Sequence, residues 1–125
     1  MSALDGVSEN QPALARADLI SRLAAATGFD WDDATGARAK VVEEMAEVDA
    51  ADGLHERADE IGDLLFAVVN WARKLGIDPE TALHGATTKF ERRFRAMEAE
   101  AGEAFPTLTL DQMEALWQRV KRQAR

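Results

Sequence analysis

Apolar side chains recur every three or four residues along most of this chain, which is the spacing of one face of an α-helix. The pattern predicts helices over about residues 12–27, 35–52, 56–75 and 79–101, and a last one from about residue 109 onward. Gly28, Gly53, Gly76 and Gly102 follow the first four segments, and glycine is the usual residue just past a helix end. β-branched residues are sparse and never alternate over a run, so we expect no strand and an all-α fold.

The third predicted helix is apolar around most of its circumference. A helix of this kind must be buried on several sides. Few neighbours from a chain of 125 residues are available to cover it, so we expect a second subunit to do so, most simply in a homodimer. The apolar positions are Ile61, Leu64, Leu65, Phe66, Val68, Val69, Trp71 and Ala72.

Local signals place some helix ends and one loop. Asp32 or Thr35 is expected to cap the second helix, because a short polar side chain can accept a hydrogen bond from its first turn. Thr109 and Gln112 have the spacing of a capping box at the start of the last helix. Residues 105–107, Phe-Pro-Thr, are expected to form a loop before it.

Two acidic motifs, EEMAE at residues 43–47 and EIGD at residues 60–63, provide the main candidate chemistry. Carboxylates three residues apart share a helix face. If the two helices pack antiparallel across the turn at residues 50–54, four carboxylates converge and need cations between them. An oxygen-only ligand set suits Mg²⁺ or Mn²⁺ better than zinc. Each motif taken alone is equally typical of a solvated helix face. The four residues are Glu44, Glu47, Glu60 and Asp63.

Other side chains have both a structural and a functional interpretation. Asn70 follows Asp63 by seven residues and shares its helix face, where it either binds a ligand or makes a hydrogen bond in the core. Trp31 lies in an aromatic link that either packs or offers a flat surface to a nucleobase. Lys89 and Arg93 are one turn apart at the edge of an apolar stripe, where they could clamp a phosphate or pair with surface acids.

Composition narrows the functional classes. The chain has no cysteine, which excludes a disulfide framework, a zinc–thiolate site and a thiol nucleophile. A net charge of −8 argues against a nucleic acid polymer as the main partner. No apolar run is long enough to span a bilayer and no signal pattern is present, so we expect no membrane association and a cytoplasmic location. Residues 1–10 are expected to be a flexible tail, followed by one domain at residues 11–125.

The chain resembles the MazG-type nucleoside triphosphate pyrophosphohydrolases, in particular the C-terminal catalytic half of two-domain MazG proteins. The resemblance rests on the EExxE and ExxD motifs, the apolar helix that follows them, and the sequence KFERRFR at residues 89–95. It covers nearly the whole chain, from about residue 12 to residue 123, and the motifs are specific in combination.

The resemblance implies a MazG-like bundle of about five helices in an intertwined homodimer. It also implies Mg²⁺-dependent hydrolysis of nucleoside triphosphates to a monophosphate and pyrophosphate, with Mn²⁺ as a possible substitute, in nucleotide-pool housecleaning. By motif position the metal ligands would be Glu44, Glu47, Glu60 and Asp63, the water-orienting base Glu43, the phosphate contacts Lys89 and Arg93, and the residue near the base Trp31.

Two alternatives and one departure accompany this interpretation. Thr87 stands where relatives often have asparagine, which puts the ligand contacts at that position in doubt. A di-iron bundle would need Glu-x-x-His pairs, and neither His55 nor His84 has a glutamate three residues earlier. A catalytically weak, nucleotide-binding dimeric module of the same fold is the other alternative. Base preference, sugar preference and the number of metal ions stay open.

Overall fold

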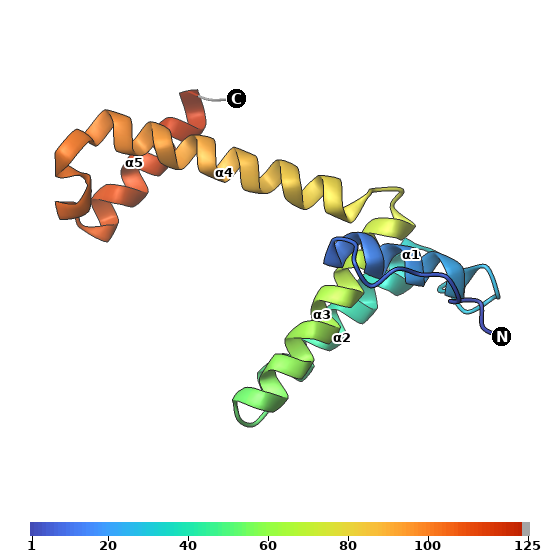
Figure 1. The fold of residues 1–125 in the computed structure, drawn as a ribbon. Helices are drawn as coiled ribbons and strands as arrows, with labels where there is room; N and C mark the ends of the chain where they lie inside the picture. Colours follow the sequence, from blue (N-terminus) through green and yellow to red (C-terminus); the bar gives the residue numbers. More distant parts are fainter. Residues whose placement is uncertain (124–125) are drawn as a thin grey trace. The chain divides into compact units, whose positions relative to one another are not determined.

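The computed structural model describes residues 1–123. Within that range it contains five α-helices, one 3-10 helix and no strand, so the predicted all-α fold is confirmed (Figure 1). The chain divides into two compact units, with the boundary between Ala82 and Leu83. The elements are α1 (Ala13–Ala25), α2 (Ala34–Ala50), α3 (Leu54–Lys74), α4 (Pro79–Ala101), η1 (Gly102–Thr107) and α5 (Leu110–Gln123).

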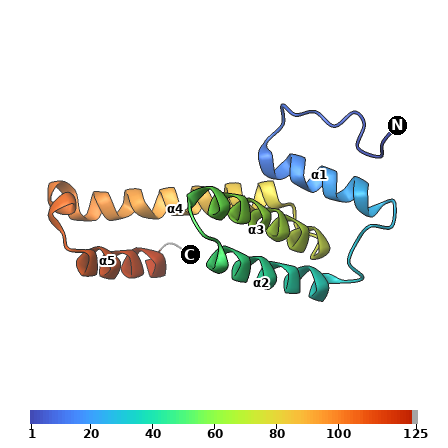
Figure 2. The ribbon, with the colours of Figure 1, turned by 90° about the horizontal axis from the view of Figure 1, so that it is seen from below.

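The first unit is built on an antiparallel hairpin of α2 and α3. The two helices lie side by side and α1 packs against α3 (Figures 1 and 2). Gly53, in the short link between the hairpin helices, has φ +85°, a left-handed conformation that favours glycine. The apolar side chains that α2 and α3 bury are small or β-branched: Ala37, Val41, Ala67 and Val69.

The second unit contains α4 from Leu83 onward, η1 and α5. Aromatic side chains contact one another across it: the ring centroids of Phe90 and Trp117 lie 5.4 Å apart, and those of Phe94 and Phe105 also lie 5.4 Å apart. The second pair meets edge to face, a favourable aromatic geometry. The contact between Phe90 and Trp117 joins α4 to α5 within this unit.

Two local expectations were wrong and one is confirmed. The cap of α2 is Asp33, whose carboxylate accepts a hydrogen bond from the Gly36 amide at 3.2 Å, and neither Asp32 nor Thr35 takes that role. Residues 105–107 belong to the 3-10 helix η1 and not to a loop. The capping box is present, because Thr109 and Gln112 exchange hydrogen bonds of 2.8 and 3.1 Å.

The third helix is only partly covered by α2 and α1. α3 buries Ala67, Val69 and Asn70, whereas other large apolar side chains of the α2–α3 hairpin stay more than two-fifths exposed. These are Val42 and Met45 on α2, and Ile61, Leu65, Phe66 and Val68 on α3. The exposure supports the expected homodimer, which stays a prediction. No helix in residues 1–123 combines the length and hydrophobicity that crossing a membrane requires.

Candidate metal centre

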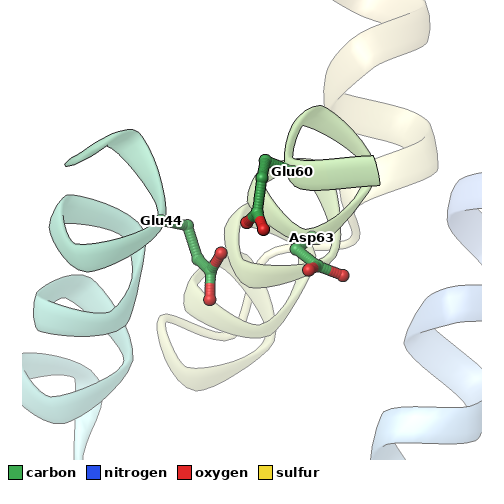
Figure 3. A group of neighbouring side chains, drawn as sticks. All are labelled: Glu44, Glu60 and Asp63. Carbon is green, nitrogen blue, oxygen red and sulfur yellow. The ribbon is translucent and has the colours of Figure 1, made fainter. Parts of the chain in front are cut away.

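Three carboxylates converge between α2 and α3. One oxygen from each of Glu44, Glu60 and Asp63 lies within 4.8 Å of the other two. Glu44 projects from α2 toward α3, where Glu60 and Asp63 stand one turn apart (Figure 3). Glu44 is only 7% exposed, so the hairpin has buried a carboxylate next to two others. The arrangement follows from the three-residue spacing of the second motif and the antiparallel packing of the hairpin.

The electrostatics of the cluster favour a cation. The pKa of Glu60 is raised above its ordinary value, first by partial removal from water and then by the negative charges of Asp63, Glu47 and Glu44. Removal from water and nearby like charges both disfavour an ionised carboxylate. A hard divalent ion would relieve this repulsion, and an all-oxygen donor set fits such an ion. The three residues therefore form a site that could bind a metal.

Glu47, the fourth predicted ligand, lies outside the group of three. It is exposed on α2, yet it is close enough to Glu60 for its charge to raise the Glu60 pKa. Its role as a ligand stays a prediction. A carboxylate on a long, exposed side chain can approach an ion by rotation about its side-chain bonds without a change in the helix.

Lys40 was missed by the sequence reasoning. Its Nζ atom lies 3.1 Å from a carboxylate oxygen of Glu44 and donates a hydrogen bond of 3.3 Å to Glu43. These contacts raise the pKa of Lys40, with the hydrogen bond to Glu44 as the largest cause. The sequence contained a signal for this contact, because residues 40 and 44 are one helical turn apart and side chains at that spacing face each other.

A cavity of about 620 Å³ opens beside the carboxylates. This volume is within the range of small-molecule sites, about 300–1,000 Å³. Its walls combine the charged residues with aromatic and amide side chains. The lining residues are Phe29, Trp31, Lys40, Glu43, Glu44, Asp63, Phe66, Ala67 and Asn70. Trp31 and Asn70, both singled out in the sequence, thus share one cavity with Glu43, Glu44 and Asp63.

Asn70 makes hydrogen bonds in the interior, as its structural interpretation predicted, and it also borders the cavity. Its side chain is 3% exposed, donates a hydrogen bond of 3.3 Å to the Phe66 carbonyl and accepts one of 3.0 Å from Arg73. The same arginine holds Asp30 with two hydrogen bonds of 2.7 and 3.1 Å. Hydrogen bonds from Arg73 are the largest cause that keeps the pKa of Asp30 well below its usual range. Asp30 and Arg73 are 43 residues apart, so no local pattern could have predicted the pair.

Lys89 and Arg93 belong to the second unit. Arg93 is half-buried, with its guanidinium carbon 5.6 Å from the Trp117 ring centroid, whereas Arg92 is exposed. The buried Nε of Arg93 has no hydrogen-bond partner among the described residues. The partial burial of Arg93 agrees with its expected position at the edge of the apolar stripe. The expected phosphate contacts of Lys89 and Arg93 stay predictions.

Comparison with known proteins gives one family. Residues 32–97 match the model of the MazG nucleotide pyrophosphohydrolase domain. This region contains α2, α3 and both acidic motifs, and it reaches into α4 past Lys89 and Arg93.

Individual relatives agree with the family match. The chain is 45% identical over 130 aligned residues to the nucleoside triphosphate pyrophosphohydrolase of Escherichia coli K12, which covers 98% of this chain and 49% of that protein. It is 40% identical over 113 residues to the nucleoside triphosphate pyrophosphohydrolase/pyrophosphatase MazG of Thermotoga maritima, covering 88% of this chain and 44% of the relative. A third match, 41% over 70 residues, is to the uncharacterized protein YabN of Bacillus subtilis. The chain spans about half the length of the first two relatives.

Proposed function

This chain belongs to the family of MazG nucleotide pyrophosphohydrolase domains, and from that membership we propose that it hydrolyses ribo- or deoxyribonucleoside triphosphates between the α and β phosphates. The products are a nucleoside monophosphate and pyrophosphate, and the reaction removes triphosphates from the nucleotide pool. The observation that carries the proposal is the convergence of Glu44, Glu60 and Asp63 beside a cavity with an aromatic wall. The carboxylates suit the metal that a triphosphate brings, and the aromatic side chains suit its base.

Mg²⁺ is the ion that we propose for this site, with Mn²⁺ as a substitute. Glu44, Glu60 and Asp63 would hold it, and Glu47 would join them after a side-chain rotation. The support is chemical: the donors are all carboxylate oxygens, and the pKa of Glu60 is raised first by partial removal from water and then by the neighbouring negative charges. A divalent ion, when bound, offsets the charge of the triphosphate and activates water.

The side chains of this chain have separate tasks in the proposed reaction. Water attacks the α-phosphorus, its new P–O bond forms as the bond to the oxygen bridging the α and β phosphates breaks, and pyrophosphate departs. Glu43 accepts the proton from the water; its carboxylate is exposed at the cavity and hydrogen-bonded to Lys40. Lys89 and Arg93 stabilise the negative charge that builds on the leaving pyrophosphate.

The base is proposed to bind at the aromatic wall of the cavity. Trp31 offers a stacking face to any base. Asn70 presents an amide, which can both donate and accept hydrogen bonds, at the edge of the same cavity. We further propose that the protein is a cytoplasmic homodimer that binds neither nucleic acid polymers nor membranes.

Turnover of a triphosphate panel tests the function. Standard and modified triphosphates are incubated with the protein and Mg²⁺, and pyrophosphate and monophosphate are quantified together. We expect equal amounts of both products from at least one triphosphate. Asp63→Ala should abolish turnover with little change in helix content, because it removes one carboxylate of the cluster and no core side chain. A panel without pyrophosphate release, or near-normal activity of the variant, would contradict the proposal.

The alternative of a nucleotide-binding module without hydrolysis makes a different prediction. Such a module would bind a triphosphate with Mg²⁺ in calorimetry while the same panel released no pyrophosphate. The presence of all four predicted carboxylates in the sequence counts against this alternative.

A further inference from the structure

The segment Phe29–Asp30–Trp31 connects α1 to α2 without being part of a helix. Its two aromatic side chains nevertheless form a wall of the cavity beside the acidic cluster. Phe29 is 83% exposed, so its own packing does little to hold it. A wall that contacts a ligand needs a fixed position, because misplacement by about 1 Å weakens binding and catalysis. Some other contact must therefore hold the segment.

Asp30, the middle residue, provides that contact. Its two carboxylate oxygens accept hydrogen bonds from Arg73 at 2.7 and 3.1 Å, and Lys74 lies 3.1 Å from one of them. Lys74 also donates a hydrogen bond of 2.8 Å to the carbonyl of Trp31. The side chains of Asp30, Arg73 and Lys74 are 20%, 9% and 16% exposed, so solvent weakens these interactions less than it weakens surface ion pairs.

Arg73 connects two walls of the cavity. Besides Asp30, it donates a hydrogen bond of 3.0 Å to the side-chain oxygen of Asn70. This bond, together with the one from Asn70 to the Phe66 carbonyl, fixes which way the Asn70 amide faces. One guanidinium thus orients both the aromatic segment and the amide that borders the same cavity.

The opposite side of the segment rests on α2. A Cβ atom built on Gly36 would lie 3.0 Å from Cδ1 of Trp31, so a side chain at residue 36 would require the indole to move by a few tenths of an ångström. Gly28, just before the segment, has φ +104°, a conformation that favours glycine and turns the chain out of α1. The segment is held between α3, through Asp30, and α2, through Trp31.

We propose that Asp30, through Arg73 and Lys74, is a positioning residue that sets the base selectivity of this site. The proposal rests on the proposed function, because selectivity has meaning only if nucleotides bind here. The side-chain partners of Asp30 are Arg73, Lys74 and the Trp31 amide, so it acts through the aromatic wall and the Asn70 amide. Removing its charge should loosen base recognition and leave the phosphate chemistry largely intact.

The first test needs no nucleotide. Protein labelled with 5-fluorotryptophan gives one ¹⁹F resonance for each of Trp31, Trp71 and Trp117, and Trp31→Phe assigns the first. Asp30→Asn should shift and sharpen the Trp31 resonance as the indole gains mobility, and leave the other two in place. Asp32→Asn is the matched control, since Asp32 is an exposed aspartate in the same link. A Trp31 resonance that is identical in wild type and Asp30→Asn would overturn the proposal.

The second test uses turnover of adenine, guanine, cytosine and thymine deoxyribonucleoside triphosphates with Mg²⁺. In Asp30→Asn we expect KM for the preferred base to rise about tenfold, kcat to change less than about threefold, and the ratio of kcat/KM between bases to approach one. Asp32→Asn should keep the wild-type pattern. A lower kcat with unchanged selectivity would mean that Asp30 acts on the phosphate chemistry, and the proposal would be wrong.

A second variant covers the case in which Asp30→Asn does not fold. Arg73→Lys keeps a positive charge for Asp30 but cannot reach Asn70 with the same planar fork. We expect it to flatten selectivity while circular dichroism stays native, and unchanged selectivity in a folded Arg73→Lys would contradict the proposal. If wild type releases no pyrophosphate, the proposed function fails, and the ¹⁹F experiment still tests how the segment is held.

Discussion

Glu44 is a carboxylate buried beside two others, which is costly unless positive charge lies near. In the described structure Lys40 supplies that charge at 3.1 Å from Glu44. The pKa of Glu60, on the α3 side, is raised first by partial removal from water and then by the negative charges of its acidic neighbours. A cluster of this kind could bind a divalent ion, and without one its like charges lower the stability of the folded protein, a common compromise at functional sites.

Glu60→Gln should stabilise the metal-free protein at neutral pH. The folded-state pKa of Glu60 is raised, so its ionisation disfavours the folded state once the pH exceeds the ordinary value of about 4.3. The variant should melt at a higher temperature than wild type at pH 7 in a chelator. The difference should shrink as the pH falls through the ordinary pKa of a glutamate, because Glu60 then becomes protonated in both states.

Thermal melts between pH 4 and pH 8 measure this pH dependence. Glu98→Gln, at an exposed residue of α4, is the control and should keep the wild-type pH profile. Mg²⁺ in excess should raise the wild-type melting temperature more than that of Glu60→Gln, because a ligand that binds only the folded state stabilises it. A metal-free variant that is less stable than wild type at pH 7 would contradict the repulsion between these carboxylates.

Arg93→Ala should cost at least about tenfold in turnover, since a charge-assisted phosphate contact in a partly dry site contributes about 1.5–3 kcal/mol. Arg92→Ala should change little. The half-buried side chain of Arg93 and the exposed one of Arg92 support this difference. Steady-state kinetics on one triphosphate measure both variants. Equal losses from the two would refute the assignment of Arg93, and melting curves would separate this from loss of the Trp117 contact.

At the scale of the element, α2 carries Glu44 of the acidic cluster and also contacts the aromatic wall through Gly36. Gly36 lies in its first turn and leaves room for Trp31. Replacing a helical glycine with alanine usually stabilises a protein by about 0.5–1 kcal/mol. At residue 36 the new methyl group would meet the indole, so helix propensity and packing oppose each other.

In Gly36→Ala the clash with Trp31 should outweigh the gain in helix propensity and destabilise the protein by about 1 kcal/mol. KM should rise, because Trp31 is displaced. Gly85→Ala in α4 is the matched control, because nothing lies within 4 Å of a Cβ built there. It should give the usual stabilisation of about 0.5–1 kcal/mol. Denaturant unfolding measures both changes in free energy. A Gly36→Ala variant stabilised as much as Gly85→Ala would show that Trp31 does not rest on α2.

At the scale of the whole molecule, the α2–α3 hairpin leaves one apolar face open to solvent. Its exposed apolar side chains belong to two adjacent helices. Val42 on α2 is 52% exposed, and Val68 on α3 is 41% exposed. Exposed apolar side chains that gather on adjacent helices usually mark a partner interface, and a two-fold homodimer is the commonest arrangement. The open face belongs to the same hairpin that carries the carboxylates, so association and ligand geometry should depend on each other.

We therefore predict a dimer at micromolar concentration whose melting temperature rises with protein concentration. Light scattering gives the mass, and melts over a hundredfold range of concentration give the dependence. Leu65→Asp places a charge on the open face and should shift the protein to monomer, whereas Leu54→Asp, an exposed leucine at the helix start, should not. A compact and active monomer would exclude the dimer.

The sequence predicted this protein best where its information is local. Helix periodicity and the glycines that follow helices predicted the five helices, and the turn between the acidic motifs predicted the α2–α3 hairpin. The three-residue spacing of Glu60 and Asp63 placed them on one face, because helical geometry is the same in every protein. The family followed from the motifs in combination, and residues 32–97 match it.

The prediction failed where competing local signals had similar strength. Asp32, Asp33 and Thr35 can all cap a helix, and only the path of the chain into α2 selected Asp33. The proline at residue 106 suggested a loop, although a 3-10 turn tolerates the same residue. These errors concern a few residues at the ends of elements. There, alternative cap residues differ in their effect on the free energy of folding by a few tenths of a kcal/mol up to about 1 kcal/mol.

What the sequence by itself determined was the set of helices, the two acidic motifs and the family. Only the tertiary structure decided which carboxylates approach within 4.8 Å, that Lys40 balances Glu44, and that Asp30 is held by Arg73 across 43 residues of sequence. The physical reason is the range of the forces. Backbone propensity and helix periodicity act over a few residues, whereas charge pairing and burial depend on which helices pack together.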